Sequence, residues 1–308
     1  MKRSSVPSKP YFFIDLPGRV NRSKGDGYKT FTISTGLIDF DIKVISEYIY
    51  VGSGSYESAN NDWYYTFFRS KNQIMIPGSS IKGAVRAVAE AISSSCVSTY
   101  SIKEKDYLYK NKNRIKCSSL NNLCPVCRIF GTTGYSGKIY FTDAPLLSGQ
   151  IEKNVQVGNL YSPRRIFGRK FYHNKTYIKP QTERGIIPLA LEAVKKDSIF
   201  KTTLSFQNLK DEELSLILHS MGINQDYKIK IGGAKPRCFG TVEITPTKIR
   251  LIDFNKDRML SSNTPFYEKD LEWIKKIMGN RNLIQEDFFN KFSMNSKIET
   301  GECPAWNY

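Results

Sequence analysis

The spacing of apolar residues along the chain predicts both strands and helices. Within residues 31–51, apolar and polar positions alternate loosely, which is typical of a strand that ends at the Gly52-Ser53-Gly54 turn. After Pro77-Gly78 the apolar positions follow one helical stripe: Ile81, Ala84, Val85, Val88, Ala89 and Ile92. Either Ser79 or Ser80 can cap the first turn of this helix.

The later part of the chain predicts further strands, a second helix and a helical tail. The polar, aromatic-containing segment 55–73 is expected to form a loop or an irregular hairpin. A second apolar stripe, from Leu214 to Met221, stops at Gly222. Strands are expected at 138–141, 186–206, 227–231 and 241–245, and tail helices at 267–278 and 283–292. This order predicts an α+β, ferredoxin-like fold, whose element order is also that of the RNA-recognition fold.

Composition and charge narrow the function. The 308 residues are 40% hydrophobic and 13% aromatic, which excludes global disorder. The longest apolar-rich stretch, 185–194, is far shorter than the ~20 residues of a membrane span, and the start, MKRSSVPSKP, lacks the apolar run of a secretory signal. We therefore expect a cytoplasmic protein with no membrane partner. Lys and Arg total 46 against 29 Asp and Glu, and the resulting charge of +17 favours a nucleic-acid partner over a merely lysine-rich proteome.

Four cysteines form the strongest chemical signal. Cys96, Cys117, Cys124 and Cys127 fall within 32 residues, and the last two form a CxxC knuckle. Four thiolates satisfy tetrahedral Zn²⁺ and leave no open position, so we predict a structural zinc site. A redox CxxC is the alternative, although the surrounding pattern is not thioredoxin-like.

The remaining cysteines and one histidine have weaker assignments. Cys96 ends the apolar helix and could instead be a core residue, in which case His173 could complete the zinc site. Cys238 and Cys303 have no near partner in the sequence, so we expect them to be packing or surface residues rather than a bonded pair.

Several cations could contact phosphate. Lys82 and Arg86 lie one turn apart near the start of the first helix, although an Arg86–Glu90 pair on a solvated face would also explain them. Lys235 and Arg237 lie in a glycine-rich segment, 232–240, whose backbone could approach phosphate closely, as could many simple hairpins.

A basic insertion at 147–182 carries seven Lys or Arg against one Glu, so 7 − 1 = +6. Aromatic residues lie among its cations Arg164, Arg165, Arg169 and Lys170. This composition suits single-stranded RNA, with cations for the backbone and rings for the bases. A lysine-rich surface loop with its rings packed on the body fits equally well.

Catalytic candidates are few. The chain has two histidines, and no Ser/His/Asp or Cys/His set can be assembled from their spacing. Asp62 lies in a polar loop before the first helix, where a lone Asp is usually a turn residue. Beside phosphates, its carboxylate could position a divalent metal or water.

Three motifs together resemble one family. Residues 76–86 (IPGSSIKGAVR), 124–131 (CPVCRIFG) and 231–240 (IGGAKPRCFG) are similar to the signature helix, the cysteine knuckle and the C-terminal glycine-rich loop of the RAMP superfamily. Members of this superfamily are the backbone subunits of type III CRISPR effector complexes. The resemblance spans about 76–245.

The resemblance implies a modified RNA-recognition palm with a thumb-like insertion, and guide RNA, target RNA and other effector subunits as partners in antiviral defence. It implies that Lys82, Arg86, Lys235 and Arg237 contact the guide backbone, that 147–182 is the thumb, and that the cysteines form a zinc insertion. Asp62 resembles the family's target-cleaving Asp, which would act as an endonuclease with Mg²⁺ or Mn²⁺.

The expected organisation is an N-terminal arm (1–30), a RAMP domain (31–250) with a zinc insertion at 94–130 and the thumb at 147–182, and a C-terminal helical extension (251–308). Two alternatives to a cleaving backbone subunit stay open. One is a non-catalytic cap or structural subunit of the same superfamily, and the other is a zinc-stabilised RNA-binding protein outside CRISPR.

Overall fold

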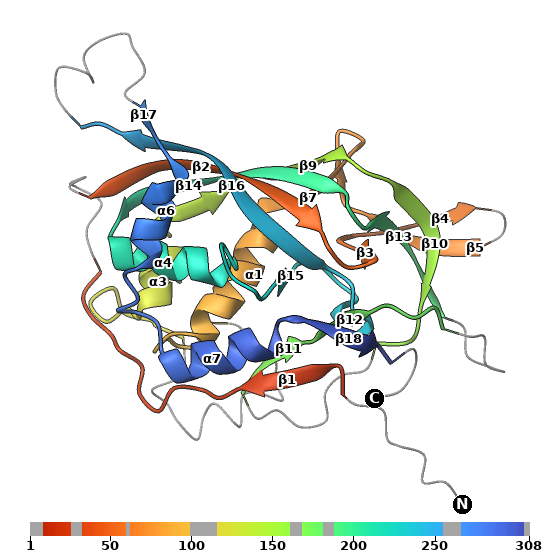
Figure 1. Ribbon diagram of the computed structural model, residues 1–308, viewed down its shortest axis with the longest axis horizontal. Helices are drawn as coiled ribbons and strands as arrows, with labels where there is room; N and C mark the ends of the chain where they lie inside the picture. The colour runs from red at the N-terminus through yellow and green to blue at the C-terminus, as the bar shows by residue number, and fades with distance from the viewer. Residues whose placement is uncertain are drawn as a thin grey trace, which may run out of the picture.

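A large antiparallel sheet runs through the centre of the molecule (Figure 1). The structure, a computed structural model, describes residues 9–25, 33–59, 62–98, 116–160, 168–180, 188–254 and 266–304. Nine strands form the sheet in the order β15-β16-β2-β14-β9-β7-β6, with β17 paired to β16 and β8 to β14. These strands are β2 (Ser34–Val44), β6 (Arg69–Ser70), β7 (Gln73–Ile76), β8 (Ile139–Phe141), β9 (Ala144–Ser148), β14 (Ile199–Leu209), β15 (Ile229–Lys230), β16 (Thr241–Ile252) and β17 (Phe266–Lys269).

The central strands follow the alternation expected of a sheet with one buried face. Phe200, Leu204 and Phe206 of β14 are fully buried, while Lys201 and Gln207, which point to the other face, are exposed. The register pairs Phe200 with Ile42 and Leu204 with Ile38 of β2. A one-residue slip would move all these apolar side chains to the other face, so the core fixes the register.

Helices pack beneath this sheet (Figure 1). They are α1 (Gly78–Ala91), α3 (Pro125–Phe130), α4 (Asp211–Ser220), α6 (Leu271–Met278) and α7 (Glu286–Asn295). The apolar stripe of α1 is buried as predicted, and each fully buried aliphatic side chain such as Ile81 or Val85 contributes about 1.5–3 kcal/mol. None of the described helices is long and apolar enough to cross a membrane.

The start of α1 differs from the prediction. Pro77 is the N-cap residue, and neither Ser79 nor Ser80 makes a capping hydrogen bond. Instead, the N–H of Gly78 donates to Asp143 Oδ1 at 2.8 Å. A Cβ on Gly78 would lie 2.0 Å from the carbonyl oxygen of Phe141, so glycine is required for this close approach. The cap therefore comes from a residue distant in the sequence.

A second, five-stranded sheet projects to one side of the body (Figure 1). Its strands are β3 (Tyr48–Ile49), β4 (Gly52–Ala59), β5 (Asp62–Phe67), β10 (Ile151–Val157) and β13 (Leu189–Lys195). Strands β4 and β5 form an antiparallel hairpin, which agrees with the irregular hairpin expected for part of 55–73. Strand β5 also pairs in parallel with β13.

The chain ends pair with the predicted thumb segment. Strand β1 (Tyr11–Ile14) pairs antiparallel with β11 (Arg169–Tyr172), and β12 (Asn174–Thr176) pairs in parallel with β18 (Ile298–Glu302). The tail, which was expected to be helical, thus contains strands as well. Strand β17 pairs with β16 of the large sheet, and β18 forms a two-stranded sheet with β12. The observed order β2-α1-β9-β14-α4-β16 confirms the α+β prediction.

Candidate metal centre and nucleic-acid interface

Four buried cysteines meet at one point. Cys96 follows α1, Cys124 caps α3 and Cys127 lies within α3, while Cys117 comes from the preceding segment. Their Sγ atoms all lie within 4.8 Å of one another. The Sγ of Cys96 lies 3.5 Å from that of Cys127, 3.6 Å from that of Cys124 and 3.9 Å from that of Cys117.

These distances suit a tetrahedral metal. Four sulfurs about 2.3 Å from one zinc ion at tetrahedral angles would lie about 3.8 Å apart. N–H donors also point at the sulfurs: the backbone of Cys124 donates to Cys117 Sγ at 3.3 Å, and Arg22 Nε donates to it at 3.4 Å. Hydrogen bonds from Cys124, Cys127, Cys96 and Arg22 lower the pKa of Cys117, whereas hydrogen bonds among the same thiols raise the pKa of Cys96 and Cys127. The spacing of the sulfurs suits a zinc ion, whose charge would hold all four as thiolates.

The geometry settles which residue completes the cluster. His173 lies elsewhere, with its Nδ1 2.6 Å from Glu299 Oε1, so the alternative of a histidine ligand is wrong. Cys96 is the fourth member. A metal there would tie α1, α3 and the segment at Cys117 together, in addition to the apolar packing of α3 against the core.

Cys238 and Cys303 form a disulfide with a Cα–Cα distance of 6.0 Å. The prediction that they are unpaired is wrong, because their sequence separation of 65 residues conceals their proximity. The pairing of β12 with β18 brings the end of the chain beside the glycine-rich loop, where the N–H of Cys303 donates to the carbonyl of Thr176 at 2.8 Å.

The glycine-rich loop packs tightly on the end of β3 and contains a short 3₁₀ turn, η2 (Lys235–Arg237). Gly232 has a φ of +89°, and a Cβ there would lie 2.1 Å from the carbonyl oxygen of Tyr50. The N–H of Gly233 donates to that same carbonyl at 2.7 Å. The loop backbone is thus held in one position beside α1.

A groove of about 400 Å³ lies between this loop and α1. Its lining is almost entirely small: Val51, Gly52, Ser80, Gly83, Ala84, Ala87, Gly232, Gly233 and Lys235. A Cβ added to Gly83 would meet nothing within 4 Å, which shows that this side of α1 is open. Small side chains let a ligand approach the backbone of both walls.

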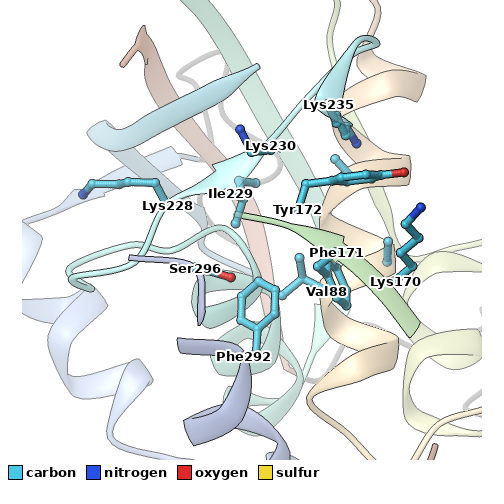
Figure 2. A pocket seen from close by; sticks show the side chains of 12 residues that line it. Val88, Lys170, Phe171, Tyr172, Lys228, Ile229, Lys230, Lys235, Phe292 and Ser296 are labelled. Atoms are coloured by element: carbon cyan, nitrogen blue, oxygen red, sulfur yellow. The ribbon is translucent and has the colours of Figure 1, made fainter. Parts of the chain in front are cut away.

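A lysine-lined pocket of about 100 Å³ continues from the groove, since Ala84, Ala87 and Lys235 line both. Lys170, Lys228 and Lys230 also line it, as does Tyr172 (Figure 2). In this view the ring of Tyr172 lies between Lys235 and Lys170. The Nζ of Lys170 lies 4.1 Å from the ring centroid of Tyr11 and 5.0 Å from that of Tyr172.

Burial makes these ammonium groups costly to charge. It lowers the pKa of Lys235 to about 8. Burial, followed by the charge of Lys235, lowers the pKa of Lys230 to about 7. Burial also lowers the pKa of Lys170. Lys228 pairs with Glu243 at 2.6 Å, and Lys230 Nζ donates to Thr241 Oγ1 at 2.8 Å. An anion such as phosphate beside Lys170 and Lys235 would favour the charged forms of these two lysines.

Three predicted cations are instead bound within the fold. Lys82 Nζ donates to the carbonyl of Ile139 at 2.8 Å, and burial lowers its pKa. Arg86 donates to Glu90 Oε1 at 2.9 Å, which matches the alternative of an Arg86–Glu90 pair, but this pair is largely buried rather than on a solvated face. Arg169 forms an ion pair with the same carboxylate.

Arg237 is 1% exposed. Its guanidinium donates to the carbonyls of Pro304 at 2.7 Å and Gly158 at 3.3 Å, and to that of Asn159. Its side chain therefore holds the loop in place, and a direct contact between Arg237 and RNA stays a prediction.

The other predicted residues divide between the pocket and undescribed positions. Lys170 and Lys235 line the pocket. Asp62 is the first residue of β5 and pairs with Ala59. Arg164 and Arg165 lie outside the described residues.

Sequence reasoning missed Lys228, Lys230 and Tyr172. A signal was available for the two lysines, since they flank Ile229 immediately before the glycine-rich loop, and an alternating pattern in extended chain places such positions on one side. Tyr172 reaches the pocket only through the pairing of β11 with β1, and no local pattern indicates this.

Comparison with known families agrees with this geometry. A family model described as the RAMP superfamily matches residues 41–243, which is 203 of 308 residues. The matched region runs from β2 to β16 and includes α1, the four cysteines and the glycine-rich loop. No curated protein matches the chain at a significant level. The chain belongs to the RAMP superfamily, and this membership implies a CRISPR-associated, RNA-binding function.

Proposed function

We propose that this chain is a guide-RNA-binding backbone subunit of a type III CRISPR effector complex, acting in the cytoplasm with other effector subunits. The groove between α1 and the glycine-rich loop, with the adjoining lysine pocket, is the observation that carries the proposal. In this proposal the RNA lies along the groove and is held by its sugar–phosphate backbone without base reading.

The chemistry of the groove supports backbone binding. Its walls are small side chains and loop backbone, so a phosphate can approach closely, and Lys235 supplies a charge at the junction with the pocket. Phosphate contacts of this kind position a strand but carry no sequence information. A subunit that must accept any guide sequence needs this type of contact.

The strand order supports a ferredoxin-like palm. The elements β2-α1-β9-β14-α4-β16 arrange their strands as β16-β2-β14-β9, all antiparallel to their neighbours. We propose that 31–250 forms this RAMP domain, with a zinc insertion at 94–130 and a thumb at 147–182, flanked by the arm 1–30 and the extension 251–308. The described part of the thumb carries Lys170 to the pocket.

The buried cations take an indirect role in this proposal. Lys82, Arg86 and Arg237 each bind a carbonyl oxygen of the chain itself. They would hold α1 and the glycine-rich loop at the correct separation for RNA. Cleavage of target RNA by Asp62 with Mg²⁺ or Mn²⁺ is a separate hypothesis, which rests on the family resemblance, and Asp62→Ala in the assembled complex tests it.

Salt-dependent RNA binding tests the proposal. We expect Lys235→Ala to weaken binding of a single-stranded RNA and to reduce the slope of log K against log salt by about 0.7 for each phosphate that is no longer neutralised. Gly83→Glu, which places a carboxylate in the open groove, should weaken binding further. Lys248→Ala is the matched control, because Lys248 is half-exposed and pairs with Glu268 on a different strand.

Two outcomes would contradict the proposal. One is an unchanged salt slope in both groove variants. The other concerns CRISPR itself: if RNA recovered with the chain from its native cells lacks a repeat-derived tag, an RNA-binding role outside CRISPR is favoured instead.

A further inference from the structure

The β4–β5 hairpin exposes three aromatic side chains on one face. Tyr56 is 63% exposed, Trp63 is 64% exposed and Tyr65 is 45% exposed. Tyr56 lies directly opposite Tyr65 in the register, and Trp63 lies two residues from Tyr65 on the same strand. The ring centroids of Tyr56 and Trp63 are 5.4 Å apart, and those of Tyr56 and Tyr65 are 6.5 Å apart. We call these three rings the aromatic face.

The opposite face of the hairpin is anchored to the body. Tyr64 is 2% exposed, and its hydroxyl donates to Glu57 Oε2 at 2.8 Å. The buried carboxylate of Glu192, on β13, accepts the N–H of Phe67 at 2.9 Å and binds Arg69 through two contacts of 2.6 Å. The exposed rings are therefore presented by a fixed ribbon, and the acidic Glu57 lies on the face away from them.

The aromatic face continues from the groove. Gly52 lines the groove and is also the first residue of β4. Tyr56 follows four residues later, but β4 is bulged between the two: Gly52 pairs with Phe67 and Tyr56 with Tyr65, so they are separated by only two residues of β5, about 7 Å at the usual rise. A strand of nucleic acid that leaves the groove beside Gly52 would reach these rings within a few nucleotides.

We propose that the aromatic face stacks unpaired nucleobases of the RNA held in the groove; this rests on the proposed function. Stacking on aromatic rings is tolerant of sequence because every base has a π-face. It therefore complements a groove that holds the backbone alone. The large apolar side chains exposed on this hairpin are all aromatic, and the strand that carries Tyr56 begins at the groove, which favours bases over a protein partner.

Trp63 provides a direct test. We expect a 20-nucleotide single-stranded RNA to quench tryptophan fluorescence of the full chain, and we expect Trp63→Leu to remove that quenching. Polyphosphate, which has charge but no bases, should bind without quenching Trp63. Trp63→Ala should weaken RNA binding by about 5- to 150-fold, the range for losing one stacked base. Trp63→Phe, which keeps a ring, should recover most of the affinity.

The salt slope separates this inference from the proposed function. Trp63→Ala should leave the slope unchanged, because every phosphate keeps its cation, whereas Lys235→Ala should reduce it. Tyr140→Ala is the control, since Tyr140 is 65% exposed on β8 and lies outside the hairpin. Thermal unfolding of each variant confirms that it folds.

Two results would overturn the inference while leaving the groove proposal standing. The first is RNA binding that neither quenches Trp63 nor weakens in Trp63→Ala, with the Lys235→Ala effect intact. The second is loss of self-association or of subunit assembly in Trp63→Ala with RNA affinity unchanged, which would make the aromatic face a protein-docking surface. If neither Lys235→Ala nor Trp63→Ala changes RNA binding, the proposed function is contradicted as well.

Discussion

The buried carboxylate of Glu90 gives the sharpest test of how this fold is held together. Glu90 lies on α1 and is 2% exposed. Its Oε1 accepts Arg86 Nε at 2.9 Å, and its Oε2 pairs with the guanidinium of Arg169 and accepts the N–H of Ser98 at 3.3 Å. One carboxylate thus joins α1 to β11 and to the segment after Cys96.

Removing that charge leaves two guanidinium groups without their carboxylate. Burial, and then the charge of Arg86, already lower the pKa of Arg169 to about 10, which shows that a charged guanidinium is costly to hold in this buried position. Breaking a buried ion pair from one side costs about 3–5 kcal/mol. At about 2.1 cal/mol/K per residue of unfolding entropy, this corresponds to a fall in Tm of about 5–8 °C for Glu90→Gln.

Thermal unfolding followed by circular dichroism measures this shift. Glu272→Gln is the control, because its partner Lys275 and Glu272 itself are 62% and 72% exposed, and an exposed pair contributes at most about 1 kcal/mol. Arg86→Met should likewise lower the Tm but leave the salt slope of RNA binding unchanged. Two results would refute the reasoning. One is a Tm for Glu90→Gln within about 1 °C of that of the parent chain, which is well below the shift expected for a broken buried pair. The other is a reduced salt slope for Arg86→Met.

Three further predictions concern pH, metal and the disulfide. RNA affinity at constant ionic strength should fall as pH rises from 7 to 9, because Lys235 loses its proton with a pKa of about 8. The stability of the RNA-free chain should rise over the same interval, because the pKa of Lys235 in the folded chain lies below its value in the unfolded chain. An RNA affinity that does not change with pH would exclude Lys235 as a contact. Metal analysis should find about one zinc per chain, less in Cys124→Ser, and a content below about half would contradict the four-cysteine site. Cys303→Ser should lower the free energy of unfolding by about 4 kcal/mol under oxidising conditions, the chain-entropy value for its 65-residue separation. In the presence of a reductant, the parent chain and the Cys303→Ser variant should have the same free energy of unfolding in urea. A difference that persists with reductant would show that the effect does not come from the disulfide.

Features encoded within a few neighbouring residues were predictable from sequence. The apolar stripe from Ile81 to Ile92 repeats at helical spacing, so α1 follows from local pattern alone. The cysteine cluster was similarly accessible, because Cys124 and Cys127 form a knuckle and the other two lie nearby. Local spacing also leads to the α+β element order, since the central strands and helices each have their own apolar pattern.

Features that depend on distant partners were not predictable. The cap on α1 comes from Asp143, 65 residues away, and the disulfide spans the same separation. The carbonyl of Gly158 that binds Arg237 is 79 residues distant. A cation in a sequence looks equally available for RNA or for the fold, and only the three-dimensional arrangement shows which backbone oxygens surround it.

Three buried arginines and two pocket lysines differ in side-chain chemistry, and under the proposed function this difference would let a strongly basic chain bind RNA without sequence preference. Arg86, Arg169 and Arg237 lie inside, where a planar guanidinium can satisfy several carbonyl or carboxylate oxygens at once. Lys170 and Lys235 line the pocket, where a compact ammonium on a flexible stem can meet a phosphate in more than one geometry. The net charge of +17 is therefore not itself the RNA footprint. The proposed footprint is the pair of lysines beside a groove whose other walls are small side chains and loop backbone, and this arrangement favours contacts to the sugar–phosphate backbone over base reading.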